Sequence, residues 1–260
     1  PSGSPSSWLF GHGNDYSADP LGFTLRYGPA YGDVVRLRFG RQPVFLLNTP
    51  EAVEHVYIRN ARNYVKDAWT RQMRGLMGKG LLLSEGEFWL RQRRLLQPAF
   101  HRERTAEYAG IIVATAERWM AAADRTAPFE LTHEMLALTL AAVARSLLGA
   151  DIEPYLPQVA RATEAAAECL KILFDRVVPL PDWVPTPVNR RLRHSARQLD
   201  AVVDALLASR RRQPAPARAP KGLIDLLLDA VARGEIPLRQ VRDEIVTLLL
   251  AGHETTALAL

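Results

Sequence analysis

The sequence predicts a mainly α-helical protein with a small β-hairpin near its N-terminus. Residues 34–39 alternate like a strand, and residues 43–47 return as the partner strand after a Gly-Arg-Gln turn. From residue 88 onwards, apolar residues instead recur at helical spacing in a series of long segments. The 260 residues are 48% hydrophobic and 23% charged, a composition typical of a soluble globular protein with a sizeable core.

Charge and cysteine content narrow the class of protein. The chain carries 33 Lys+Arg against 28 Asp+Glu, a net charge of +5 that is spread along its length. There is no dense basic run with interleaved aromatic residues, so the excess favours an acidic partner surface over nucleic acid. Cys169 is the only cysteine, which excludes an intramolecular disulfide, and we expect it to be a buried helix residue. Without a signal-peptide pattern or an apolar span of membrane length, the sequence predicts a cytoplasmic protein with no membrane anchor.

Two capped helices are predicted on either side of the hairpin. After an irregular lead, Asp19 caps a helix over residues 20–31, with proline in the first helical position. Thr49 caps the helix that follows the second strand. This second helix is expected to turn three apolar residues inward, namely Val53, Val56 and Tyr57.

A glycine-interrupted segment in the middle of the chain precedes a series of helices. Gly75, Gly78 and Gly80 prevent a long helix there, and Ser84 with Glu87 resembles a capping box for the helix that follows. The predicted helices cover residues 88–98, 106–124, 136–148, 157–174, 190–212, 223–232 and 238–260, with a proline-rich turn at 179–187 and an exposed linker at 213–220.

The last predicted helix carries an acid and two hydroxyls in residues 251–256, which read Ala-Gly-His-Glu-Thr-Thr. This helix is expected to be buried, and burying an unpaired carboxylate such as that of Glu254 costs several kcal/mol, so the placement indicates a site. Gly252 costs about 1 kcal/mol against alanine in mid-helix, but its missing Cβ allows a flat group to approach the backbone. The hydroxyl of Thr255 can compete for the carbonyl of Ala251, which loosens the helix locally.

Trp89 and Arg93 lie four residues apart, so they share one face of the helix over residues 88–98. A guanidinium forms a charge-assisted fork with a carboxylate, and an indole adds one N–H donor. The pair can therefore hold an acidic group; the alternative is a surface helix with an aromatic–cation pair.

Both patterns resemble motifs of the cytochrome P450 family. Residues 251–256 resemble the oxygen-binding motif of its long I helix, Ala/Gly-Gly-x-Asp/Glu-Thr-Thr. The Trp-x-x-x-Arg pattern, followed by Pro-Ala-Phe at 98–100, is similar to the family's C helix, and the N-terminal helix, hairpin, helix order also matches. The resemblance implies that residues 1–260 are the N-terminal portion of a single cytochrome P450 domain, ending within the I helix.

The resemblance implies a haem-dependent monooxygenase that inserts one oxygen atom from O2 into a small apolar organic substrate. It implies heme b as cofactor and an electron donor such as an acidic ferredoxin with its reductase, and the Ala-, Arg- and Pro-rich composition suggests a bacterial source. Glu254 and Thr255 are the implied catalytic residues, which deliver protons, and Leu82 and Leu83 are implied to shape the substrate pocket. The residues implied to contact the cofactor region are Lys66, Trp89, Arg93, Ala251, Gly252 and Thr256. Of these, Trp89 and Arg93 are implied to bind a haem propionate, and Lys66 is a weaker third candidate for that group. Thr256 is implied to be mainly structural.

No metal ligand is expected within the chain, because the family's axial Cys and its Glu-x-x-Arg helix are expected beyond residue 260. Without that thiolate, residues 1–260 alone are not expected to be active. The alternatives are a truncated, non-catalytic helical binding module and a relative that rearranges peroxides without O2, which the pair Glu254–Thr255 disfavours. A zinc-protease interpretation fails, because the second His of His-Glu-x-x-His would fall at Ala257.

Overall fold

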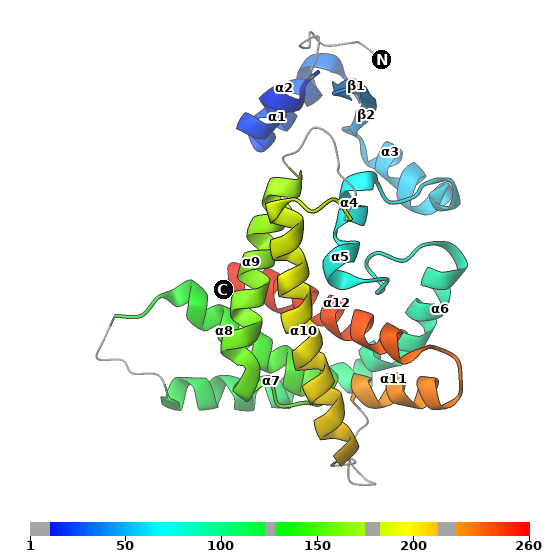
Figure 1. Ribbon diagram of the computed structural model, residues 1–260. Coiled ribbons are helices and arrows are strands. Elements are labelled where there is room, and N and C mark those ends of the chain that lie inside the picture. The colour runs from blue at the N-terminus through cyan, green and yellow to red at the C-terminus, as the bar shows by residue number, and fades with distance from the viewer. Residues whose placement is uncertain (1–10, 123–127, 175–182, 213–221) are drawn as a thin grey trace. The chain divides into compact units, whose positions relative to one another are not determined.

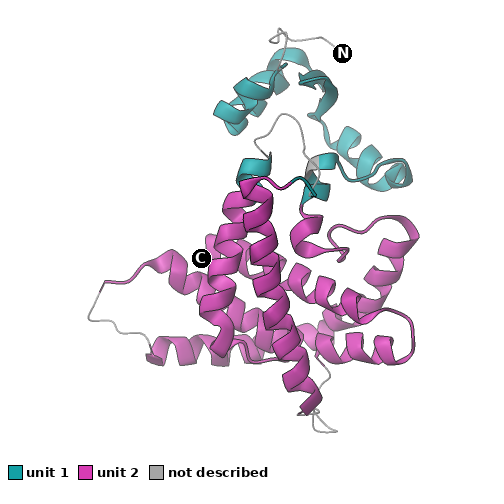
Figure 2. Ribbon diagram, viewed as in Figure 1, with its two compact units in different colours: residues 1–72, 170–184 teal, residues 73–169, 185–260 magenta. Residues whose placement is uncertain are grey.

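The computed structural model describes residues 11–122, 128–174, 183–212 and 222–260, and it confirms a mainly helical chain with one N-terminal hairpin. It comprises two compact units (Figure 2). Unit 1 contains residues 1–72 and 170–184, and unit 2 contains residues 73–169 and 185–260. The predicted linker at 213–220, and most of the proline-rich turn at 179–187, lie outside the described residues.

Unit 1 is built around the hairpin. Strands β1 and β2 pair antiparallel, with Val34 opposite Leu47 and Phe39 opposite Gln42. The predicted caps are confirmed, because the side chain of Asp19 accepts from the Gly22 N–H at 2.9 Å. The elements are α1 (Gly13–Ala18), α2 (Pro20–Tyr31), β1 (Val34–Phe39), β2 (Gln42–Leu47), α3 (Pro50–Glu54), the π-helical turn η1 (His55–Arg59), η2 (Ala61–Asn63) and α4 (Ala68–Gln72).

Two expectations for unit 1 are wrong. The lead before Pro20 is not irregular throughout, because it contains the short helix α1. This helix begins after His12 without a side-chain cap. Val53 and Tyr57 do not turn inward, because they are 42% and 77% exposed. The core of unit 1 instead consists of Phe23, Val35 and Leu37, which lie between α2 and the inner face of the hairpin.

Unit 2 holds most of the helices, drawn in magenta in Figure 2. The end of α9, from residue 170, is counted with unit 1. The elements are α5 (Arg74–Met77), α6 (Gly86–Leu96), η3 (Gln97–Phe100), α7 (Arg102–Ala122), α8 (Leu131–Val143), η4 (Ala144–Leu148), η5 (Glu153–Tyr155), α9 (Leu156–Phe174), α10 (Pro187–Arg212), α11 (Leu223–Ala232) and α12 (Leu238–Ala259).

The predicted capping box at the start of α6 is wrong. Glu85 occupies the N-cap position without a side-chain cap, and Gly86 follows with φ +59°. The Ser84 hydroxyl lies one residue before the N-cap and donates to the Leu81 carbonyl at 3.3 Å. The predicted end of the α8 segment at Gly149 is confirmed, with that residue in the left-handed region.

Helix α12 is the central element of unit 2. It packs along α8 and also contacts α5, α10 and α11 (Figure 1). Its buried apolar side chains include Val241, Ile245, Val246 and Leu249. These contacts fix the direction in which each face of α12 points, and therefore the position of residues 251–256.

Helix α8 explains the apolar run at 131–148. Among the described residues, Leu131–Leu148 is the one stretch that is long and apolar enough to cross a membrane. It packs against α12 and α7 within unit 2, and a third of its residues are buried. Cys169 on α9 is 1% exposed, which confirms the expected buried helix cysteine.

Candidate functional site

Residues 251–256 occupy the penultimate turns of α12, and their polar side chains lie on its exposed face. Glu254, Thr255 and Thr256 are all exposed in this chain, so the expected burial of the acid is wrong here. The buried positions of the same turns are His253 and Ala257, which face the interior of unit 2. The acid and hydroxyls are thus presented outward from the helix.

Contacts with α8 fix the orientation of these turns. A Cβ at Gly252 would lie 3.0 Å from Val143 Cγ2, so this glycine permits close packing of α8 on α12. Packing against Val143 is thus one reason for a glycine at position 252, and the expected approach of a flat group in the cofactor region stays a prediction. One turn earlier on α8, the Thr139 hydroxyl donates to the His253 carbonyl at 2.9 Å.

The two threonine hydroxyls bond to their own helix. Thr255 Oγ1 donates to the Ala251 carbonyl at 2.8 Å, which confirms the expected competition for that carbonyl, and Thr256 Oγ1 donates to the Gly252 carbonyl at 3.0 Å. The helix continues without interruption to Ala259, so no local opening accompanies these bonds.

A cavity of about 730 Å³ lies between α8, α9 and α12. Glu254 and His253 line it, whereas Thr255 is not among its lining residues. His253 is 2% exposed, and its Nδ1 lies 2.6 Å from the Leu249 carbonyl, so Nδ1 carries the proton. Burial lowers the pKa of His253, and this outweighs the opposing effects of the Leu249 carbonyl and of Glu254. His253 is therefore a neutral ring whose other nitrogen is an acceptor.

On α6, the guanidinium carbon of Arg93 lies 5.4 Å from the centre of the Trp89 ring, so the two side chains share one face, as their spacing predicts. Among the described residues, Arg93 has no carboxylate partner, and the Trp89 indole N–H has no acceptor. An exposed cation and an unoccupied N–H donor on one face suit a carboxylate of a bound group. The pair therefore fits a haem propionate, which stays a prediction for both residues. Lys66, the third candidate, belongs to unit 1.

The two candidate pocket residues in the segment before α6, Leu82 and Leu83, differ in their exposure. Leu82 is 44% exposed, whereas Leu83 is 1% exposed and belongs to the core of unit 2. Leu83 N–H bonds to the Gly80 carbonyl at 2.9 Å, so the segment is a tight turn. Leu82 is thus the one of the two that can contact a ligand directly.

A family model for cytochrome P450 matches residues 1–260 of the chain. The chain belongs to the cytochrome P450 family. Its fold agrees, since the crystal structure of a cytochrome P450 (CYP102L1) superimposes with a TM-score of 0.73 at 21% identity, covering 94% of this chain and 57% of that one.

Two curated relatives match the chain over nearly its whole length. "Cyclooctatin synthase" from Streptomyces melanosporofaciens is 33% identical over 97% of this chain and 55% of its own length. "Cyclooctat-9-en-7-ol 5-monooxygenase" from the same species is 30% identical over 96% of this chain and 54% of its own length. The chain thus spans about half the length of the curated relatives it matches.

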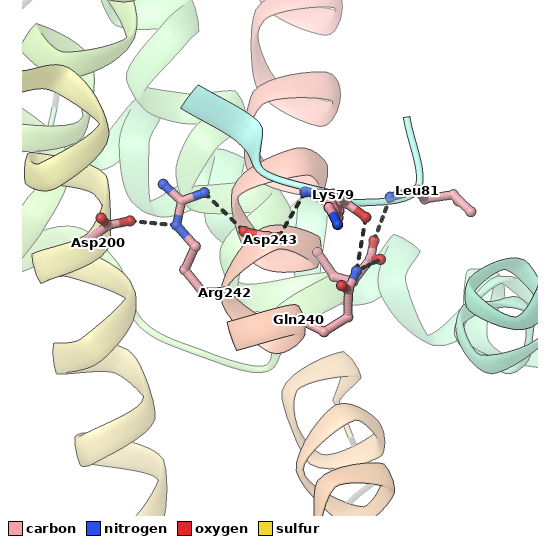
Figure 3. Close-up of polar contacts among 7 residues, drawn as sticks. Lys79, Leu81, Asp200, Gln240, Arg242 and Asp243 are labelled. Atoms are coloured by element: carbon pink, nitrogen blue, oxygen red, sulfur yellow. Dashed lines mark hydrogen bonds and ion pairs between the residues drawn. The ribbon is translucent and has the colours of Figure 1, made fainter. Parts of the chain in front are cut away.

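A buried acidic pair on α12 of this cytochrome P450 chain was not predicted from the sequence. Asp243 and Glu244 on α12 are 4% and 0% exposed, and both accept hydrogen bonds from the backbone of residues 79–81 (Figure 3). Burial raises the pKa of Glu244, and the bonds from Leu81 and Gln240 oppose that rise. The available signal was the helical spacing of the polar residues at 240, 243, 244 and 247, which lie among the apolar residues at 241, 245, 246 and 248–250.

Proposed function

We propose that the protein to which this chain belongs is a haem-dependent monooxygenase, which inserts one oxygen atom from O2 into a small apolar organic substrate. The observation that carries the proposal is the placement of Glu254 and Thr255 on the exposed face of α12, with Glu254 lining a cavity, in a chain of the cytochrome P450 family. One relative is named as a 5-monooxygenase of cyclooctat-9-en-7-ol, which supports the reaction type and a largely apolar substrate.

Heme b is the proposed cofactor, and when bound it supplies the iron at which O2 is activated. Trp89 and Arg93 would hold one propionate, because they offer an indole N–H and a guanidinium on one face of α6. We place the axial thiolate outside residues 1–260. Cys169 does not suit that role, because burial raises the pKa of its thiol and keeps it protonated.

Glu254 would relay protons, and Thr255 would hold the last donor in place. Glu254 lines the cavity between α8, α9 and α12, which gives its carboxylate a path for water. Thr255 is not on that cavity, and its hydroxyl can both donate and accept. The two neighbours therefore suit different tasks, one supplying protons and the other orienting them.

The direct test uses the full-length protein with haem, an electron donor and 18O2. Turnover of cyclooctat-9-en-7-ol, the compound in the name of one relative, is expected to give a product that carries one 18O atom, with the second appearing in water. A full-length protein that contains haem but gives unlabelled, rearranged product would contradict the proposal. A preparation that never takes up haem would instead favour the binding-module alternative.

Arg93→Leu is expected to accelerate loss of haem from the full-length protein. A hydrogen bond to a charged group contributes about 1.5–3 kcal/mol, which corresponds to roughly 10- to 150-fold in the dissociation rate if the transition state lacks it. The measurement is transfer of haem to an excess of an acceptor apoprotein. Arg91→Leu is the matched control, because Arg91 is also an exposed arginine stacked on an aromatic ring, at 5.7 Å from the Phe88 centre. Equal rates for both variants would show that Arg93 holds no propionate.

The proposed electron donor is an acidic ferredoxin. Arg91, Arg94 and Arg102 are exposed on or just after α6, and Arg104 follows them but pairs with Glu107 at 2.9 Å. Three exposed guanidinium groups close together in the chain suit a partner with a carboxylate-rich surface. The same segment carries Arg93, so the donor would dock near the proposed propionate site.

A further inference from the structure

A buried polar stripe on α12 holds the backbone of the segment over residues 78–81. The stripe consists of Gln240, Asp243, Glu244 and Thr247, which are spaced at helical intervals and are each at most 4% exposed. Burying four polar side chains on one face of a helix is costly unless they are paired. This face therefore serves a particular contact, because core packing alone would be satisfied by apolar residues.

Three members of the stripe, Gln240, Asp243 and Glu244, make that contact, and we call them the α12 clamp. Asp243 Oδ2 accepts the Lys79 N–H at 2.8 Å, and Glu244 Oε2 accepts the Leu81 N–H at 2.9 Å (Figure 3). Gln240 Nε2 donates to the Lys79 carbonyl at 3.0 Å and to Glu244 Oε1 at 2.8 Å. Every backbone bond of this turn toward α12 thus ends on the clamp.

Each clamp carboxylate faces two donors, one on each oxygen. The second oxygen of Glu244 faces Gln240, and the second oxygen of Asp243 accepts from Arg242 Nη1 at 3.2 Å. Arg242 also pairs with Asp200 on α10, as Figure 3 shows. An amide in place of either carboxylate would leave one of its two donors without an acceptor.

The glycines of the segment permit this close approach. A Cβ at Gly78 would lie 2.0 Å from Asp243 Oδ1, and one at Gly80 would lie 2.1 Å from Thr247 Oγ1. Gly78 also has a φ of +64°, a backbone conformation that residues other than glycine rarely adopt. The lack of side chains at Gly78 and Gly80 therefore lets the backbone of this segment lie directly against α12.

The position of the clamped segment determines which of the two following leucines, Leu82 or Leu83, is exposed. With Lys79 and Leu81 held, the turn places Leu83 in the core and Leu82 outward at 44% exposure. A shift of the turn by one residue would exchange these positions. We propose that Asp243 and Glu244 are positioning residues for substrate selectivity, which hold the segment over residues 78–81 so that Leu82 faces the substrate. This inference rests on the proposed function, because it takes Leu82 as a pocket residue.

The first readout needs neither haem nor substrate. Hydrogen exchange of the full-length protein, followed by mass spectrometry of a peptide over residues 76–84, reports the protection of the Lys79 and Leu81 amides. Asp243→Asn and Glu244→Gln are expected to speed exchange there roughly 10-fold or more, the equivalent of one lost hydrogen bond to a charged group. Glu235→Gln is the matched control, because Glu235 is an exposed acid paired with Arg233 in the same unit.

The second readout is selectivity. In the haem-loaded protein, binding of imidazole and of the bulkier 4-phenylimidazole is measured from the shift of the haem absorption band. Both clamp variants are expected to change the ratio of the two dissociation constants by about 10-fold, whereas Glu235→Gln leaves it unchanged. Leu82→Ala, which leaves the clamp intact, is expected to change the ratio without faster exchange.

The outcomes distinguish the existence of the clamp from its role in substrate selectivity. Unchanged exchange in both clamp variants would overturn the clamp, and faster exchange with an unchanged ratio would overturn its role in selectivity. If the clamp variants fail to fold, Leu82→Ala still decides, because an unchanged ratio there removes the segment from the pocket. A parent protein that shows no shift with either probe would contradict the proposed function itself, while the exchange result would stand.

Discussion

Replacing Thr255 by alanine in the full-length enzyme is expected to divert electrons from product to hydrogen peroxide. Inserting one oxygen atom consumes O2, two electrons and two protons and also yields one water, whereas peroxide formation consumes the same without breaking the O–O bond. The Thr255 hydroxyl lies on the exposed face of α12 and donates to the Ala251 carbonyl at 2.8 Å, so its oxygen can still accept from a water. General acid assistance contributes roughly 10²–10⁴ in rate, so we expect product per electron pair to fall by about tenfold or more.

The measurement is product and peroxide formed per electron pair supplied, with substrate binding and haem reduction as checks that should stay near the parent values. Thr255→Ser is the matched control, because it keeps the hydroxyl and should keep the coupling. Glu254→Gln is expected to behave differently: turnover slows with a larger solvent isotope effect, because the relay from the cavity is impaired. If Thr255→Ala couples electrons to product as well as the parent does, Thr255 only packs in the helix.

Reversing the charge of Arg94 is expected to slow reduction by an acidic ferredoxin. Arg94 is exposed on α6, and among the described residues it has no ion pair to lose. Electrostatic steering raises association rates by roughly 10- to 1000-fold, so Arg94→Glu should remove about tenfold or more at low ionic strength. The parent rate should fall steeply as salt rises, because exposed charges are screened beyond about 10 Å at 0.1 M.

Arg161→Glu is the matched control for this experiment. Arg161 is equally exposed but lies on α9, and the charge change is identical. Stopped-flow reduction at several salt concentrations compares the two variants with the parent. Reduction rates that ignore both salt and Arg94→Glu would remove α6 as the docking surface.

Local patterns in the sequence determined most of the elements. The hairpin follows from alternation and a glycine turn, and helix α11 has the bounds predicted from its apolar run and the Gly234 that follows it. The caps at Asp19 and Thr49 were predictable because each bond spans three residues. Ser84 shows the limit, since the helix begins one residue later than its spacing to Glu87 predicts, and Glu85 occupies the N-cap position.

The sequence also determined that Trp89 and Arg93 share a face and that residues 251–256 form a polar motif in a helix, since both follow from helical spacing alone. Only the tertiary structure decided which face meets the rest of the protein. Periodicity orders side chains around a helix axis, but their burial depends on partners that are distant in the sequence. Gly252, for example, packs against Val143 of α8. Asp243 and Glu244 are buried because they bind the backbone of residues 79–81, more than 160 positions away, whereas Glu254 on the same helix is exposed.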